Sequence, residues 1–128
     1  MNRPYLLAVD DEPDMAVLVA EVAELEGYEA QALTSGPALL AELAHRAADV
    51  IVLDVVMPEM DGIELCRRLA ERQCAAALVL ISGYDGRYLH DVEALARAHQ
   101  LRVAATLTKP LNLAELRAVL RALAGRNP

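Results

Sequence analysis

The stretch 50-VIVLD-54 is apolar at four consecutive positions and ends in a carboxylate. A short, unbroken run of aliphatic residues is typical of a strand whose two faces are both covered, as in the parallel sheets of α/β proteins. A charge at the end of such a strand is costly unless it has partners. The stretch therefore predicts a central parallel strand that carries Asp54 at its carboxyl end.

Three further apolar runs also end in polar residues. The runs 5-YLLAVDD-11, 77-ALVLIS-82 and 103-VAATLTK-109 end in Asp10 and Asp11, in Ser82 and in Lys109, which is the single lysine beside eleven arginines. In an open parallel α/β sheet, the carboxyl ends of the strands form the crevice that binds ligands. We therefore expect three carboxylates, a hydroxyl and an ammonium group to meet at one edge of the sheet.

Segments with helical spacing of apolar residues separate the runs, which indicates repeated βα units around a parallel sheet. A first helix is expected from Pro13 to a stop at Gly27. Its predicted inner face consists of Met15, Leu18, Val19, Val22 and Leu25. The run from Tyr28 to Leu33 is less apolar and predicts an edge strand. Later helices are expected after Ser35, after the cap residues Asp61 and Asn112, and from Arg87 to His99.

Size and composition restrict the class of protein. The chain has 128 residues, enough for one domain, and its core must be aliphatic because it lacks Trp and Phe. Its net charge of −7 argues against nucleic-acid binding, which needs a basic face. Cys66 and Cys74 are too few for a disulfide framework and are expected to be reduced. Without a signal-peptide pattern or an apolar stretch near ~20 residues, we expect a cytoplasmic protein that does not bind membranes.

The expected cluster of carboxylates has a specific chemical consequence. Asp10, Asp11 and Asp54 would repel one another unless a cation lies among them, and oxygen-only ligands of this type suit Mg²⁺. The alternative for the segment 11–14, Asp-Glu-Pro-Asp, is an ordinary acidic helix start. That alternative leaves Asp54 at the end of an apolar strand unexplained.

An aspartate beside Mg²⁺ can also act as a nucleophile toward phosphorus and form an acyl phosphate. The phosphoryl oxygens then need partners, which Mg²⁺, the Lys109 ammonium, the Ser82 hydroxyl and backbone N–H groups can provide. Pro110 can hold an unusual backbone conformation, such as a cis peptide bond, that directs Lys109 inward. A serine at a strand end or a lone lysine is weak evidence by itself; the combination is specific.

These residues together resemble the receiver domain of bacterial two-component response regulators, the CheY-like superfamily. The matching motifs are Asp10-Asp11, Asp54 with Met57-Pro58 and Asp61-Gly62 behind it, Ser82-Gly83, and Lys109-Pro110. The resemblance covers the whole chain, residues 1–128, and the motifs stand in the order and spacing of the family. The resemblance implies a doubly wound, flavodoxin-like (βα)5 fold with five parallel strands in the order 2-1-3-4-5.

The resemblance also implies a role for each motif residue. Asp54 would be the phosphoacceptor, and Asp10, Asp11, Asp54 and the backbone carbonyl of Val56 would hold Mg²⁺. Ser82 and Lys109 would contact the phosphoryl group. The implied protein is a signalling switch rather than an enzyme, although it catalyses its own phosphorylation and dephosphorylation at Asp54.

The implied phosphodonor is a histidine kinase or a histidine phosphotransfer protein. A partner or an attached output domain, which the sequence does not identify, would read a change at residues 82–90 and at the last strand and helix. We expect a monomer or a weak homodimer that depends on phosphorylation. The family often has an aromatic residue three positions before its lysine, which turns inward on activation. Thr106 stands there, so we expect either a weaker population shift or one that is relayed through the Tyr84 loop.

Three alternatives use the same topology or chemistry. A phosphatase of the haloacid dehalogenase type resembles Asp-x-Asp at its nucleophile, but Val56 occupies the position of the second aspartate. A flavodoxin-like cofactor binder needs a phosphate loop rich in Ser, Thr and Gly after the first strand, and none is present. A degenerate receiver that only binds proteins would not need the complete set of acidic, hydroxyl and lysine residues.

Overall fold

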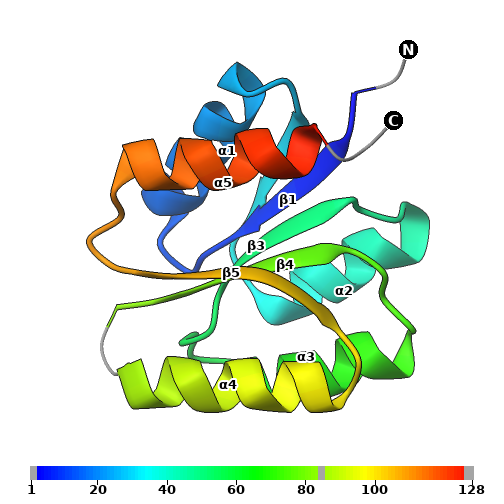
Figure 1. The fold of residues 1–128 in the computed structure, drawn as a ribbon. Coiled ribbons are helices and arrows are strands. Elements are labelled where there is room, and N and C mark those ends of the chain that lie inside the picture. The colour runs from blue at the N-terminus through cyan, green and yellow to red at the C-terminus, as the bar shows by residue number, and fades with distance from the viewer. Residues whose placement is uncertain (1–2, 84–85, 126–128) are drawn as a thin grey trace.

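The computed structural model describes residues 3–83 and 86–125. Within these residues, five parallel strands form one sheet in the order β2-β1-β3-β4-β5, and five helices connect and follow them (Figure 1). The elements are β1 (Tyr5–Val9), α1 (Pro13–Leu25), β2 (Glu29–Leu33), α2 (Gly36–His45), β3 (Val50–Asp54), α3 (Gly62–Glu71), β4 (Ala77–Ser82), α4 (Gly86–Ala98), β5 (Arg102–Thr108) and α5 (Leu113–Ala124). The predicted doubly wound fold and strand order are confirmed.

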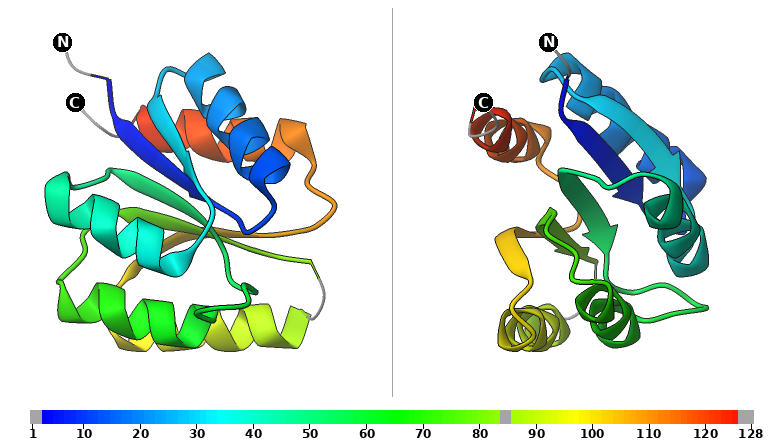
Figure 2. Two further views of the ribbon diagram at one scale, coloured as in Figure 1. Left: turned by 180° about the vertical axis from the view of Figure 1, so that it is seen from behind. Right: turned by 90° about the vertical axis from the view of Figure 1, so that its right-hand side faces the viewer.

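The helices cover both faces of the sheet, so the core has two halves. Helices α1 and α5 pack on one face, while α2, α3 and α4 pack on the other (Figures 1 and 2). Along β3, Ile51 and Leu53 belong to one half and Val50 and Val52 to the other, because successive side chains of a strand point to opposite faces. This double burial explains why the run beginning at Val50 is continuously apolar.

The two edge strands, β2 and β5, are more exposed to solvent than the three central strands. The side chains of β2 are all at least partly exposed, which confirms the edge position predicted from its weaker apolar character. In β5, buried residues such as Val103 and Leu107 are interspersed with exposed ones such as Arg102 and Thr106. Among the described residues, no helix is long and apolar enough to cross a membrane.

The inner face predicted for α1 is partly wrong. Leu18 and Leu25 are 36% and 73% exposed, whereas the buried residues are Ala16, Val19, Ala20, Val22 and Ala23. Alanines allow a helix to lie close to the sheet, so the stripe of small residues faces inward and the larger leucines remain outside.

Tyr28 lies just before β2, not within it, and its buried hydroxyl donates to the Leu120 carbonyl oxygen at 2.7 Å.

Two predicted helix caps are present. The side chains of Asp61 and Asn112 accept hydrogen bonds from the backbone N–H groups of Glu64 at 2.9 Å and Glu115 at 3.0 Å. Gly62, after the first cap, lies against the segment that follows β3: a Cβ added there would be 2.8 Å from Val55 Cβ. Glycine therefore allows α3 to begin close to the end of the strand that carries Asp54.

Glu26 links the two helices on one face of the sheet. Its carboxylate accepts hydrogen bonds from Arg121 Nε at 3.0 Å and Arg117 Nε at 2.7 Å, and its side chain is only 5% exposed. These bonds lower the pKa of Glu26 from its ordinary value of 4.5, and the bond from Arg121 has the larger effect. Glu26 therefore connects the end of α1 to α5.

We predict that Glu26→Gln lowers the melting temperature at neutral pH, because both guanidinium groups lose a charged acceptor. A depressed carboxyl pKa stabilises the fold above the unfolded pKa, and this contribution disappears as pH falls through the folded pKa. Thermal melts should therefore show the difference from wild type shrinking at acidic pH. Glu24→Gln, an exposed change in the last turn of α1, is the control and should have little effect; an equal loss there would contradict the assignment.

Candidate functional site

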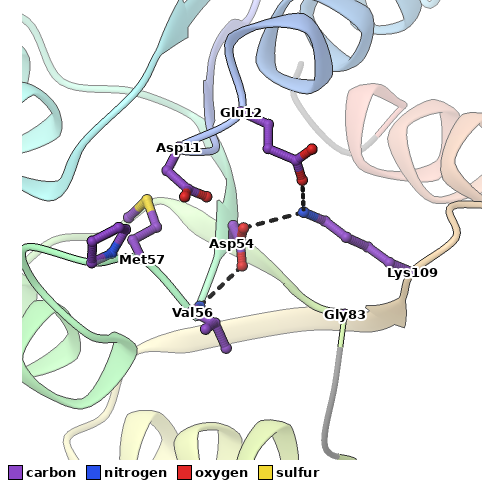
Figure 3. A pocket seen from close by; sticks show the side chains of 8 residues that line it. Asp11, Glu12, Asp54, Val56, Met57, Gly83 and Lys109 are labelled. Carbon is purple, nitrogen blue, oxygen red and sulfur yellow. Dashed lines mark hydrogen bonds and ion pairs between the residues drawn. The ribbon is translucent and has the colours of Figure 1, made fainter.

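A pocket of about 650 Å³ opens at the carboxyl edge of the sheet (Figure 3). The sheet order explains its position, because the chain leaves β1 and β3 toward opposite faces and a crevice forms between their ends. Val9 pairs with Leu53, so Asp10, just after β1, lies beside Asp54, the last residue of β3. The pocket is lined by Asp11, Glu12, Asp54, Val56, Met57, Pro58, Gly83 and Lys109.

Three carboxylates converge there as the sequence predicts. Each of Asp10, Asp11 and Asp54 offers an oxygen within 4.8 Å of the others. Asp10 and Asp54 are 3% and 4% exposed, whereas Asp11 is exposed to solvent. Two unit charges 4 Å apart interact by about 4 kcal/mol at an effective dielectric constant of 20. The cluster therefore needs positive charge, and its hard oxygen donors fit a divalent metal ion.

The two buried carboxylates are oriented in the same way. Asp10 Oδ1 accepts from the Glu12 N–H at 2.9 Å, and Asp54 Oδ1 accepts from the Val56 N–H at 3.0 Å. In both, the donor is the backbone group two residues further along the chain. One oxygen of each carboxylate is thus held by the backbone, and the other oxygen faces Lys109.

Lys109 brings a positive charge from β5 to this cluster. Its Nζ lies 3.0 Å from Asp10 Oδ2, 3.2 Å from Asp54 Oδ2 and 3.4 Å from Glu12 Oε1. The aliphatic stem passes Gly83, where an added Cβ would be 3.3 Å from Lys109 Cδ. The Lys109–Pro110 peptide bond is cis, as anticipated.

Burial and the neighbouring charges act in opposite directions on the ionisation of this group of residues. Burial raises the pKa of Asp54, with the Asp10 charge adding to the effect, and the Val56 N–H and Lys109 only partly offset the rise. Burial lowers the pKa of Lys109, but its hydrogen bond to Asp10 and the charges of Asp54 and Asp10 have the larger, opposite effect. The pKa of Lys109 is therefore raised above its ordinary value. The ammonium, which several carboxylates share, therefore stays protonated. Its charge does not fully offset the effect of burial on the pKa of Asp54.

Ser82 is buried, and its hydroxyl is unsatisfied. The residue is 2% exposed, and its Oγ has no hydrogen-bond partner within the described part of the chain. It ends β4 beside Thr108 in the sheet register, and its carbonyl accepts from the Lys109 N–H at 2.9 Å. A buried hydroxyl without a protein partner is unusual in native proteins, and this one can donate to or accept from a further group.

The remaining predicted residues have different positions. Val56 lines the pocket, with 37% of its surface exposed. Thr106 lies on an exposed position of β5 and is not part of the pocket lining. Tyr84, which the sequence suggested as a relay, lies outside the described residues. Residue spacing did not reveal the contact of Glu12 with Lys109, although Glu12 directly follows the predicted pair Asp10-Asp11.

Residues 6–121 match the family model of the response regulator receiver domain. The chain belongs to this family. It is 33% identical over 121 residues to the sensory transduction protein RegX3 of Mycobacterium tuberculosis, covering 94% of this chain and 51% of RegX3. It is 37% identical over 123 residues to the transcriptional regulatory protein TcrA of the same organism, covering 96% of this chain and 47% of TcrA. The receiver domain thus spans about half the length of these curated relatives.

A solved structure agrees with the family assignment. A response regulator from Colwellia psychrerythraea superposes with a TM-score of 0.85 at 36% identity, covering 98% of this chain and 100% of that chain. The chain is thus a receiver domain of two-component signalling, a family whose general function is phosphoryl transfer to an aspartate. The dehalogenase-type and flavodoxin-type alternatives do not describe its family.

We predict that Asp54→Asn stabilises the protein when a chelator removes divalent metal. The isosteric change removes a buried charge that repels Asp10, while Lys109 keeps its contacts with Asp10 and Glu12. Thermal melting in the chelator should show an increase of a few degrees. Asp49→Asn at the opposite end of the sheet is the control: Asp49 accepts from the Tyr5 N–H at 2.7 Å, so this change should not stabilise. An unchanged or lower melting temperature for Asp54→Asn would contradict the prediction.

Proposed function

We propose that Asp54 is the phosphoacceptor of this receiver domain and that a phosphohistidine of a histidine kinase or histidine phosphotransfer protein is the donor. The observation that carries the proposal is the position of Asp54, which borders the acidic cluster on one side and the Lys109 ammonium on the other. A nucleophile, a metal-binding group and a fixed cation are thus within reach of one phosphoryl group. A histidine is the donor expected for the family, and the pocket is open to solvent.

The side chains can take distinct parts in the transfer. One oxygen of Asp54 attacks phosphorus; the P–O bond to the aspartate forms, the P–N bond to the imidazole breaks, and the imidazole leaves with the bonding electron pair. Lys109 can neutralise a phosphoryl oxygen, and the Ser82 hydroxyl, which has no partner among the residues that the structure describes, can donate to another. The Val56 N–H already donates to Asp54 and holds its orientation.

The metal that we propose is Mg²⁺, held by Asp10, Asp11, Asp54 and the backbone carbonyl of Val56. The donors fit because all are hard oxygens, and one of the carboxylates, Asp11, is exposed to the solvent from which the ion arrives. When bound, Mg²⁺ would neutralise charge on the carboxylates and on the phosphoryl oxygens. Asp10 shares its oxygens between the Glu12 N–H and Lys109, which leaves Asp11 as the most accessible ligand.

We predict that a small phosphodonor with Mg²⁺ adds one base-labile phosphoryl group to the wild-type chain. Intact-mass measurement should show this addition, and Asp54→Asn should abolish it because the nucleophilic oxygen is lost. Asp11→Ala should raise the Mg²⁺ concentration required for half-maximal labelling, because it removes a ligand. Asp49→Asn serves as the control and should be labelled like wild type. Labelling that persists in Asp54→Asn would refute the assignment of the acceptor.

The proposed role of the domain is that of a switch rather than a catalyst of a metabolic reaction. A phosphoryl group changes a distant surface only if two conformations differ in their contacts with it. Ser82 and Lys109 supply this difference, since both can turn toward the phosphoryl oxygens and move residues 82–90, β5 and α5. TcrA is named a transcriptional regulatory protein; for this chain we propose that a partner or an attached output domain reads the surface.

We also propose that the receiver domain occupies residues 1–128, acts in the cytoplasm and is a monomer or a weak homodimer that depends on phosphorylation. The family match to residues 6–121 supports the extent of the domain. The net charge of −7 supports a protein partner rather than direct nucleic-acid binding.

We propose that the conformational change is relayed through Tyr84, because Thr106 is small and lies on the exposed side of β5.

We predict that the phosphoryl mimic beryllofluoride, added with Mg²⁺, shifts amide NMR signals at residues 82–90 and around Lys109. Ser82→Ala should reduce these shifts because it removes the hydroxyl that follows the phosphoryl group. Tyr84→Ala should perturb the response more than Thr106→Ala does. If Thr106→Ala has an equal or larger effect, the relay runs through the last strand instead.

A further inference from the structure

The Glu12 side chain is not used to cap helix α1, although Glu12 is the residue at the cap position. Its carboxylate makes no capping hydrogen bond. Its backbone is nevertheless fixed, because the N–H donates to Asp10 Oδ1 at 2.9 Å and the carbonyl accepts from the N–H groups of Met15 at 3.0 Å and Ala16 at 3.1 Å. A fixed backbone with an uncommitted carboxylate leaves Glu12 free to reach across the pocket mouth to Lys109 (Figure 3).

Each of the three hydrogens of the Lys109 ammonium can be matched with one carboxylate neighbour among the described residues. An ammonium group donates three hydrogen bonds and accepts none. Its Nζ lies within 3.4 Å of an oxygen of Asp10, Asp54 and Glu12. A phosphoryl group on Asp54 therefore competes with Asp10 and Glu12 for the ammonium, and one of these contacts weakens when the phosphoryl contact forms.

The three carboxylates differ in what the loss of the Lys109 contact costs. Asp54 itself carries the phosphoryl group in the proposed reaction, so it does not remain as a free carboxylate. The Asp10 side chain is 5% exposed and would be a poorly solvated charge without its cation. The Glu12 side chain is 67% exposed, and water can replace the ammonium there at little cost. Glu12 is the partner that can be displaced.

We propose that Glu12 is a positioning residue that holds Lys109 at the pocket mouth and competes with the phosphoryl group for its ammonium. This inference rests on the proposed function, because it takes Lys109 to be the cation that the phosphoryl group contacts. Glu12 thereby lowers the affinity of the pocket for a phosphoryl group, and it keeps the resting position of Lys109 defined.

The test measures beryllofluoride affinity at saturating Mg²⁺ by titration. Glu12→Gln should bind beryllofluoride about two- to five-fold more tightly than wild type, the range that corresponds to one exposed ion pair. Glu12→Asp keeps the charge but shortens the side chain by one methylene, so a role through contact predicts that it behaves like Glu12→Gln. Asp14→Asn, an exposed charge removal two residues along, is the matched control and should leave the affinity unchanged.

A spectroscopic readout separates this role from a structural one. Because Lys109 is the single lysine of the chain, lysine labelled with ¹⁵N at Nζ gives one signal that reports on this ammonium alone. Glu12→Gln should shift that signal in the free protein, whereas the wild-type and variant signals should coincide once beryllofluoride has displaced Glu12.

The outcomes distinguish the two proposals. If wild-type protein binds no beryllofluoride in Mg²⁺, the proposed phosphoacceptor function fails. If wild type binds it but Glu12→Gln has equal or weaker affinity, only the competition by Glu12 is overturned. If Glu12→Asp matches wild type while Glu12→Gln binds more tightly, the effect comes from long-range charge and the proposed contact is wrong.

Discussion

The Lys109 ammonium between the buried carboxylates of Asp10 and Asp54 is the interaction on which the site depends. These two groups lie at the carboxyl ends of adjacent strands, where burial weakens the screening of their repulsion. The lysine comes from β5, which is separated from β3 by β4, so its side chain must cross the end of β4. Gly83 at that position leaves room for the stem. One cation thus joins the ends of β1, β3 and β5.

The order of the strands is the constraint behind this arrangement. Since β1 and β3 are neighbours and their connections leave toward opposite faces, the crevice opens where Asp10, Asp11 and Asp54 are located. The same order buries β3 under helices on both faces, which requires an apolar strand up to its last residue. Fold stability and the location of the chemistry therefore have a common origin in the topology.

The site combines polar groups that are bound firmly with groups that can change partners. The backbone N–H groups of Glu12 and Val56 hold the two buried aspartates in place. The Ser82 hydroxyl, by contrast, lacks a partner within the described residues, and the exposed Glu12 carboxylate can exchange Lys109 for water. A phosphoryl group would meet one unsatisfied donor and one donor that is readily released. Such differences in contact are what a ligand needs in order to shift a conformational equilibrium.

The sequence by itself determined the five βα units, the edge position of β2, the caps at Asp61 and Asn112, and the strand ends that carry the site. These features follow from local rules, namely side-chain periodicity, cap chemistry and the meeting of parallel strand ends. The tertiary structure alone decided that the alanine stripe of α1 faces the sheet, that Tyr28 bonds to Leu120, and that Glu12 reaches Lys109. Periodicity permits several overlapping helical faces, and the last two contacts join residues 92 and 97 positions apart. Such contacts are decided by packing between distant elements, which local spacing does not encode.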